Sequence, residues 1–369
     1  MSDSGLRIGF DYWFAATHAP GIGRYLRELV RALAALEQGP RLALLDVGPE
    51  GESIPEAALG LGAAGATVTH RKLRVRRGFL RWSERLSPLR AEAWLGDLDV
   101  FHRARATGAP SARAPQVVAV AEAPRSQAEL LALKHMAAVI VFSETARLEL
   151  LRQRAADEAR IHVLDVGCDH WAREWTDVAE ARGRPRILVL GSVVATGPQL
   201  DVLQAFERAR GRGFDCDLVI CGRRGDGAAR LELALRGSPF RTDVRWIDEP
   251  VESAMPALLH SASVLVHLAR DAWTPVTALE AFSLGVAVVV HRTEVFESAL
   301  GDLAHYVDSE GTVLDVSALD RAIDGALIQG RGFTHSARRR ERASRLTWAA
   351  NARATVAVYE TARAARSER

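Results

Sequence analysis

The chain opens with a strand-to-helix sequence, LRIGFDYWFAATHAPGIGRYLRELVRALAAL (residues 6–36), in which two hydrophobic patterns follow one another. Leu6–Phe10 is a short apolar run with the length of a buried strand. From Gly21 to Leu36 the apolar residues recur with helical spacing, so that they share one face of a helix. The segment therefore predicts the first strand–loop–helix unit of a parallel sheet.

The same alternation continues along the chain in two series. The first series has further predicted strands at Leu42–Val47, Thr67–Thr69, Val100–His102, Gln116–Val120, Ala138–Phe142 and Ile161–Leu164. The second series has them at Arg186–Leu190, Asp217–Cys221, Val244–Ile247, Val264–Leu268 and Val286–His291. Helices are predicted at Glu144–Arg154, Leu200–Ala209, Pro256–His260, Thr277–Leu284, Leu319–Leu327 and Ala337–Ala365.

A polar stretch, Trp171–Pro185, separates the two series and reads as a linker. A chain of 369 residues is long enough for two domains, each with its own core. We therefore expect an α/β protein with an N-terminal Rossmann-like domain at 1–175 and a C-terminal one at 176–345. Ligands of such parallel sheets bind at the carboxyl ends of the strands, which places the site in a cleft between the domains.

Composition excludes several classes of protein. The formal net charge of +2 is too small for a nucleic-acid-binding chain. Cys168, Cys216 and Cys221 have no metal-ligand spacing and read as buried thiols of a reducing compartment. Met1–Gly9 lacks the basic and apolar regions of a signal peptide, and no apolar run reaches the ~18–20 residues that span a bilayer. We expect a cytoplasmic protein, with peripheral contact at the inner membrane left open.

Short segments along nearly the whole chain follow one another in a recognisable order and spacing. They are Pro20–Tyr25, Ala138–Thr145, Arg160–Val163 with Gly167 and Asp169, Val219–Gly222, Leu279–Ala281 with Gly285 and Val286, Leu300–Asp302, Tyr306–Asp308 and Leu346–Trp348. In this order they resemble glycosyltransferase family four, the group 1 glycosyltransferases. The resemblance implies the GT-B fold, which has two Rossmann-like domains with an interdomain cleft, and a last helix, 346–369, that crosses back to the first domain.

The residues of the expected nucleotide-sugar site are predicted partly from the chemistry of helix amino termini and partly from the family resemblance. Gly21 and Gly23 precede and begin a helix, where backbone N–H groups and the helix dipole attract a diphosphate; the alternative is a tight turn alone. In the family, the glutamate that matches Glu280 binds the ribose hydroxyls; the alternative is a solvated helix residue. The predicted nucleotide-sugar-binding residues are Gly21, Gly23, Arg24, Gly191, Gly222, Arg223 and Glu280.

Three features of the family pattern are missing. The first glutamate of the family's pair falls on Ala272, with Asp271 beside it. The basic pair that neutralises the diphosphate is replaced by Thr196 and Gly197. Arg223 and Arg224 are the nearest substitutes along the chain, or else solvated turn residues. The histidine that follows the Gln116–Val120 strand is replaced by Ala121, with Glu122 next. Glu122 and Asp271 are therefore the catalytic candidates.

A basic segment needs its own interpretation. Between His70 and Arg90 there are eight Arg or Lys residues and one acid, Glu84, interleaved with apolar side chains. Basic amphipathic segments bind anionic lipid, so this segment is a candidate contact with a membrane that carries a lipid-linked acceptor. The alternative is a solvated loop or a partner surface.

Two functions follow from the resemblance. The first is a retaining, metal-independent glycosyltransferase that moves a hexose from a nucleotide sugar to a glycan or lipid-linked acceptor in bacterial surface polysaccharide synthesis. It needs no cofactor besides its nucleotide-sugar substrate. The second is a catalytically inactive, glycosyltransferase-like subunit that scaffolds or regulates a partner glycosyltransferase. Gly21, Gly23 and Glu280 favour the first, and Ala121, Thr196, Gly197 and Ala272 favour the second.

Overall fold

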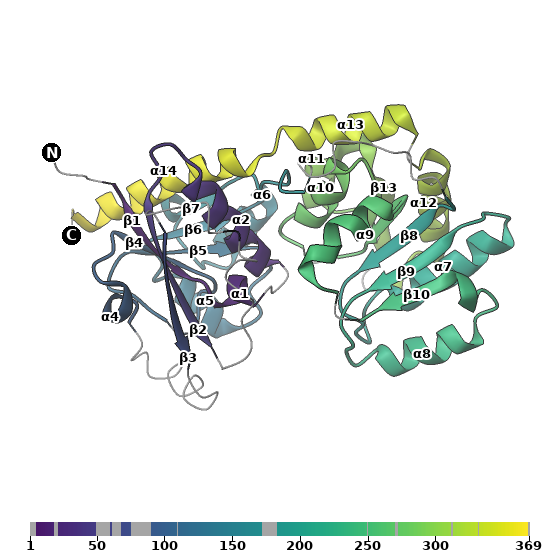
Figure 1. Cartoon of the computed structure of the whole chain (residues 1–369), viewed down its shortest axis with the longest axis horizontal. Helices are drawn as coiled ribbons and strands as arrows, with labels where there is room; N and C mark the ends of the chain where they lie inside the picture. The colour runs from purple at the N-terminus through teal and green to yellow at the C-terminus, as the bar shows by residue number, and fades with distance from the viewer. Residues whose placement is uncertain are drawn as a thin grey trace. The chain divides into compact units, whose positions relative to one another are not determined.

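The computed structural model describes residues 5–17, 21–48, 60, 68–74, 90–108, 110–171, 183–248, 250–269, 272–310, 313–330 and 332–367. The chain divides into two compact units (Figure 1). Unit 1 comprises Met1–Gly167, Ala272–Thr274 and Thr347–Arg369, and unit 2 comprises Cys168–Asp271 and Pro275–Leu346.

Unit 1 contains a seven-stranded parallel sheet of order β3-β2-β1-β4-β5-β6-β7. Its strands are β1 (Arg7–Asp11), β2 (Arg41–Gly48), β3 (Val68–Arg74), β4 (Val100–Arg103), β5 (Gln116–Val120), β6 (Ala138–Val141) and β7 (Ile161–Val163). Its helices are α1 (Trp13–Ala16), α2 (Ile22–Ala34), α4 (Glu92–Leu95), α5 (Gln127–Leu133), α6 (Glu144–Arg152) and α14 (Trp348–Ser367), with the 3₁₀ turn η3 (Glu158–Arg160).

Helices cover both faces of this sheet. Leu95 of α4 packs with Phe101 of β4 in one hydrophobic cluster, and Leu150 of α6 packs with Val118 of β5 in another on the same face. The opposite face carries α2 and α14, which lie side by side in Figure 1. There Tyr359 of α14 meets the ring of Phe10 edge to face. The strands are apolar on both faces because both are covered, as is typical of parallel sheets.

Unit 2 contains a six-stranded parallel sheet of order β10-β9-β8-β11-β12-β13 and a small antiparallel pair, β14-β15. Its strands are β8 (Arg186–Leu190), β9 (Asp217–Cys221), β10 (Val244–Ile247), β11 (Val264–His267), β12 (Ala287–His291), β13 (His305–Val307), β14 (Ser309–Glu310) and β15 (Val313–Leu314). Its helices are α7 (Gln199–Gly211), α8 (Ala228–Gly237), α9 (Met255–Ser261), α10 (Val276–Ser283), α11 (Glu294–Leu300), α12 (Val316–Gln329) and α13 (Phe333–Ser344), with the 3₁₀ turns η4 (Arg241–Asp243), η5 (Glu252–Ala254) and η6 (Gly301–Leu303).

The arginines of α13 bind the carboxyl ends of neighbouring helices in unit 2. Arg339 is 1% exposed and donates to the carbonyl oxygens of Gly330 (2.9 Å) and Gly285 (3.4 Å), which follow α12 and α10. Arg342 donates to Ala299 O (2.9 Å) at the end of α11. Cations at helix carboxyl ends are stabilised by the orphan carbonyls and by the helix dipole. The arginine-rich composition of α13 therefore holds α10, α11 and α12 in place.

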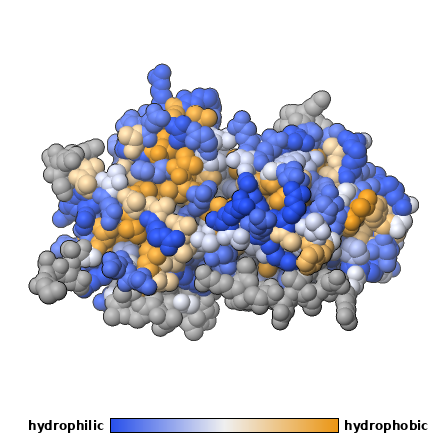
Figure 2. Space-filling model, turned by 90° about the horizontal axis from the view of Figure 1, so that it is seen from above, coloured by the Kyte–Doolittle hydropathy of each residue, from blue (hydrophilic) through white to orange (hydrophobic). Residues whose placement is uncertain are grey.

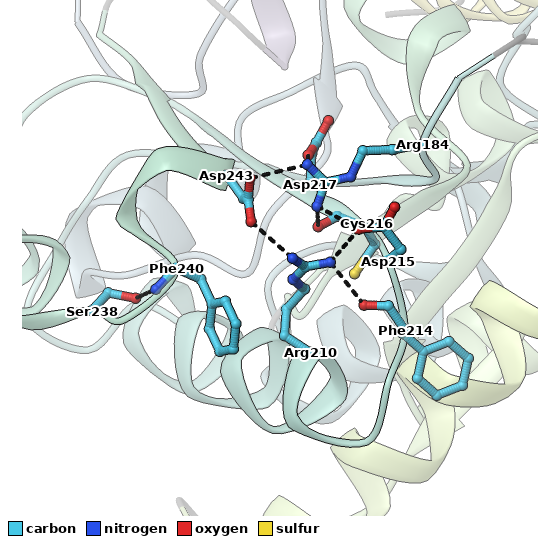
Figure 3. Close-up of polar contacts among 9 residues, drawn as sticks. All are labelled: Arg184, Arg210, Phe214, Asp215, Cys216, Asp217, Ser238, Phe240 and Asp243. Carbon is cyan, nitrogen blue, oxygen red and sulfur yellow. Dashed lines mark hydrogen bonds and ion pairs between the residues drawn. The ribbon is translucent and has the colours of Figure 1, made fainter.

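A second arginine network lies at the amino-terminal edge of the unit 2 sheet (Figure 3). Arg184 and Arg210 reach the two carboxylate oxygens of Asp243 at 3.0 Å each. Arg184 also pairs with Asp217, and Arg210 with Asp215. Hydrogen bonds from Arg184 hold the pKa of Asp243 below its usual range, and those from Arg210 do the same for Asp215. The network ties together the segments that enter β8, β9 and β10.

The prediction of an α/β protein with two Rossmann-like sheets is confirmed. One predicted helix, Ala337–Ala365, is wrong in its continuity: the range holds α13 and α14, which are separate helices. Thr347 explains the break, because its hydroxyl accepts a hydrogen bond from the N–H of Ala350 (3.2 Å) and so begins a new helix. Most of the polar linker lies outside the described residues.

No helix in the described part of the chain is both long and apolar enough to cross a bilayer. Figure 2 shows hydrophilic and hydrophobic residues interspersed over the face that it displays. Of the predicted basic segment, 75–89 lies outside the described residues. Arg74 is described and makes a two-point ion pair with the buried carboxylate of Asp46 (3.1 and 2.8 Å).

Candidate functional site

Each sheet has one point at which the order of its strands reverses. In unit 2 it lies between β8 and β11, and in unit 1 between β1 and β4. Loops that leave the carboxyl ends of two such strands diverge in opposite directions, and the crevice between them is where open α/β sheets bind ligands. Each unit therefore has a candidate ligand crevice at this point of its sheet.

In unit 2 the predicted glycines after β8 and β9 lie against one another. Gly191 has a φ of +135°, in the region that favours glycine, and its N–H donates to Cys221 O (3.1 Å). A Cβ at Gly222 would lie 1.9 Å from the carbonyl oxygen of Gly191. Gly222 is therefore needed for close approach of the two backbones, and the structure brings these two predicted residues together.

The loop from β8 to α7 uses its own backbone donors. The N–H of Val193 donates to Arg223 O (2.9 Å), and that of Gly197 donates to Val194 O (2.9 Å). The N–H of Ala195 donates to the carboxylate of Asp226 (2.8 Å), on the neighbouring loop. Thr196 and Gly197 stand where a basic pair was expected and bring no charge. This loop therefore offers little positive potential of its own.

The two arginines proposed as substitutes differ in their surroundings. Arg224 lies over the ring of Trp246 (4.5 Å to the centroid) and pairs with Asp248 (3.0 Å) and Glu232. Its charge is therefore already matched by two carboxylates on unit 2. Arg223 is exposed.

Glu280 is buried, with 0% exposure, on α10. Its Oε1 lies 3.2 Å from Nε2 of His170. His267, at the end of β11, is near enough to feel the same carboxylate: burial lowers the pKa of His267 to about 4, and the charge of Glu280 opposes that shift. The alternative of a solvated helix glutamate is thereby excluded. Glu280 is an enclosed carboxylate beside imidazoles, at the strand ends that border the switch point.

In unit 1 the predicted glycines begin α2. Gly21 is its N-cap with a φ of +66°, and a Cβ there would meet no atom within 4 Å. Backbone conformation, and not lack of space, therefore requires glycine at this position. Gly23 and Arg24 are buried in the first turn of the helix.

Of the two catalytic candidates, Glu122 and Asp271, the structure describes only Glu122. The carboxylate of Glu122 is exposed and pairs with Arg125 (2.7 Å). The backbone of Glu122 forms an antiparallel bridge with Ala272, so the structure brings the residue after Ala121 beside the position of the missing glutamate. Asp271 lies outside the described residues. Trp273 packs in the core of unit 1, and its carbonyl oxygen accepts from Ser143 Oγ (3.2 Å).

Sequence reasoning missed a polar group at the switch point of unit 1. Asp11 ends β1 and is 6% exposed. Burial raises the pKa of its carboxyl to about 6, against the opposing charges of Arg103 and Arg105 and a hydrogen bond from the Ala104 N–H. A perturbed acid at a ligand crevice is a functional candidate. The available signal was an aspartate directly after the first strand, since that strand borders the switch point.

The comparisons with known proteins agree with this architecture. Residues 174–345 match the model of the glycosyl transferases group 1. No curated protein sequence matches the chain. Among solved structures, sucrose-phosphate synthase from Thermosynechococcus elongatus is 17% identical with a TM-score of 0.73, covering 98% of this chain and 100% of that one.

Two further structures are related to glycan synthesis or nucleotide-sugar binding. WaaG, a glycosyltransferase involved in lipopolysaccharide biosynthesis, is 13% identical with a TM-score of 0.66, covering 94% of this chain and 98% of that one. Anabaena Alr3699/HepE, in complex with UDP and glucose, is 12% identical with a TM-score of 0.64, covering 99% and 100%. The chain therefore adopts the GT-B fold, and its second domain is the part that matches the group 1 glycosyl transferases.

Proposed function

We propose that the chain is a retaining glycosyltransferase of family four, which moves a hexose from a nucleotide sugar to a glycan or lipid-linked acceptor of a bacterial surface polysaccharide. The observation that carries the proposal is the group 1 match over residues 174–345, which includes β8, α10 and both glycine loops. The full-length likeness to WaaG and to the UDP complex of HepE supports the same class of donor and product.

The residue roles follow from the site. Gly191 and Gly222 allow the two loops of unit 2 to approach closely at the strand ends. Glu280 is the proposed ribose ligand, and His170 must then move to expose its carboxylate. In unit 1, the first turn of α2 at Gly21, Gly23 and Arg24 is the proposed second contact with the donor. Arg223, which is exposed, is the remaining candidate cation in the unit 2 loops.

Calorimetry with a panel of nucleoside diphosphates tests the donor proposal. Glu280→Gln should weaken nucleotide binding by roughly 1–3 kcal/mol, because a charged hydrogen bond to a ribose hydroxyl is lost. Glu341→Gln, which changes an exposed ion pair with Arg345 in the same unit, is the matched control and should leave affinity unchanged. Thermal unfolding checks that both variants are folded. Equal affinity of Glu280→Gln and the unmodified chain would remove Glu280 from the site.

A second function is favoured by specific observations. Arg224 is matched by two carboxylates, Asp226 binds the loop amide of Ala195, and Glu280 is covered by His170. These contacts favour a catalytically inactive subunit that scaffolds or regulates a partner glycosyltransferase. A chain in the crystal structure of the GtfA/B complex is 13% identical with a TM-score of 0.56, covering 78% of this chain and 60% of that one. Turnover of a nucleotide sugar by the purified chain alone would rule out this second function.

Peripheral membrane contact through the 70–90 segment is part of the same proposal, because a lipid-linked acceptor lies at a membrane. Flotation with anionic vesicles tests it. Binding should fall steeply as salt is added, since screening weakens interactions between exposed charges. Absence of binding at low salt would remove the membrane contact and leave the donor chemistry untouched.

A further inference from the structure

A small cavity lies at the start of α7, beside the switch point of unit 2. Its volume is about 50 Å³, and its lining includes Ala195, Gly197, Gln199, Asp226 and Arg230. A water molecule needs roughly 10–15 Å³ of such space, so the cavity has room for a few waters or one small polar group. By position it is where a helix amino terminus attracts an anion.

Gln199 is a buried polar side chain in the lining of this cavity. Its side chain is 2% exposed, and Nε2 donates to Gly191 O (3.2 Å) and Ser192 O (3.1 Å). Because Nε2 is the donor in both bonds, the second terminal atom of the side-chain amide is the carbonyl oxygen, Oε1. Oε1 has no hydrogen-bond partner among the described residues. A buried acceptor of this kind requires a donor, and phosphate oxygens supply none at neutral pH beyond a single hydroxyl.

Asp226 adds a charge of the same sign as a phosphate. Its Oδ1 accepts from the N–H of Ala195 (2.8 Å), which is the kind of loop amide that would otherwise bind an anion. Asp226 is exposed, and solvent therefore reaches its side chain. Because its carboxylate occupies the Ala195 N–H, an incoming anion could bind that N–H only by displacing the carboxylate. Glycines allow this contact: a Cβ at Gly225 or Gly227 would lie 2.7 or 2.6 Å from the backbone of Val193 or Val194.

We infer that Asp226 is an internal anion that closes the β8–α7 loop to phosphate, and that it sets the loop's preference for groups that donate hydrogen bonds. The inference concerns the regulation of the proposed donor site and rests on that proposal for its biological meaning. A diphosphate that uses this loop must first displace the carboxylate from the Ala195 N–H. Donor affinity is therefore held low until something moves Asp226.

Inorganic pyrophosphate is the probe, because it tests the loop without a nucleotide or a sugar. Asp226→Asn keeps an oxygen that can accept from Ala195 and removes the charge. Asp226→Ala frees the amide as well. Calorimetry on the full chain should show at least tenfold tighter pyrophosphate binding by both variants than by the unmodified chain. Asp215→Asn is the matched control, since it removes a carboxylate at the opposite edge of the same sheet, and it should leave binding unchanged.

Amide hydrogen exchange gives a second readout in the unmodified chain. The Ala195 N–H should be protected, and the protection should be lost in Asp226→Ala. Equal pyrophosphate affinity of the unmodified chain and Asp226→Asn, whether both bind or neither does, would overturn the inference, as would an unprotected Ala195 amide. Tighter pyrophosphate binding without turnover of any nucleotide sugar would keep the inference and contradict the proposed function. Turnover of a nucleotide sugar, with pyrophosphate affinity unchanged in Asp226→Asn, would support the proposed function and contradict the inference.

Discussion

Nδ1 of His102 and the hydroxyl of Tyr359 share a hydrogen bond of 2.7 Å, although 257 positions separate them along the chain. Both side chains are buried, and burial lowers the pKa of His102 to about 3, so the imidazole is neutral. The bond joins β4, in the middle of the unit 1 sheet, to α14. It is a polar contact between the last helix and this sheet, beside the edge-to-face pair of Phe10 and Tyr359.

Tyr359→Phe should therefore destabilise the protein by about 1–3 kcal/mol, because the buried Nδ1 loses its partner. Tyr12→Phe is the matched control: Tyr12 is equally buried, but its hydroxyl has no hydrogen-bond partner among the described residues. Urea unfolding followed by circular dichroism measures both. If the two substitutions lower the midpoint equally, the His102–Tyr359 bond does not stabilise the fold as described.

Removal of Arg339 should loosen the helices of unit 2. Arg339→Met leaves the carbonyl oxygen of Gly330 without its charged donor, a loss of roughly 1–3 kcal/mol, whereas Gly285 O keeps its hydrogen bond from Ser336 Oγ (3.1 Å). Arg338→Met changes the adjacent arginine, which is half-exposed and pairs with Asp302, and should have little effect. Thermal and urea unfolding compare the two. An equal loss of unfolding free energy in the two variants would show that the buried hydrogen bonds of Arg339 do not stabilise unit 2.

Asp11 should make the protein less stable as the pH rises from 4 to 7. Its folded pKa of about 6 exceeds the unfolded value of 3.8, so the folded state holds the proton more tightly. That advantage is complete below pH 3.8 and is lost as the pH rises to about 6, which amounts to about 3 kcal/mol. The difference in unfolding free energy between the unmodified chain and Asp11→Asn, measured from pH 4 to 7, should fall accordingly. A difference in unfolding free energy that does not change with pH would contradict a raised pKa of the buried Asp11.

Asp243 should show the opposite sign. Hydrogen bonds from Arg184 lower its folded pKa below the unfolded value of 3.8, so its contribution is present above that pH and is lost as the pH falls through the folded value. The difference in unfolding free energy between the unmodified chain and Asp243→Asn should therefore shrink as the pH falls below 3.8. A difference that grows in acid would mean that the network in Figure 3 does not favour the carboxylate.

Much of the sheet architecture could be predicted because parallel strands buried on both faces are nearly continuous apolar runs. The predicted bounds of β5, β8, β9 and β10 agree with the structure. Short or strongly charged helices were missed, as at α8, where Arg and Glu interrupt the apolar pattern. The break between α13 and α14 was also missed in the helix pattern, because a single hydroxyl, that of Thr347, begins the second helix.

The site was less predictable, because burial and pairing are set by residues distant in sequence. The helix that carries Glu280 was predicted, but not that His170 would cover its carboxylate. Arg224 could be proposed as a cation for the donor, but its two acidic partners and Trp246 come from separate segments of unit 2. Asp226 gave no signal at all, since its role depends on the backbone N–H of Ala195 on another loop.

The most direct test of the glycosyltransferase proposal is to incubate the purified chain with a panel of nucleotide sugars and lipid-linked or oligosaccharide acceptors, and to follow the products by proton NMR. We predict that one nucleotide sugar is consumed faster than without protein, and that the transferred sugar keeps the anomeric configuration of the donor. Consumption at the protein-free rate for every nucleotide sugar, or a product of inverted configuration, would contradict it.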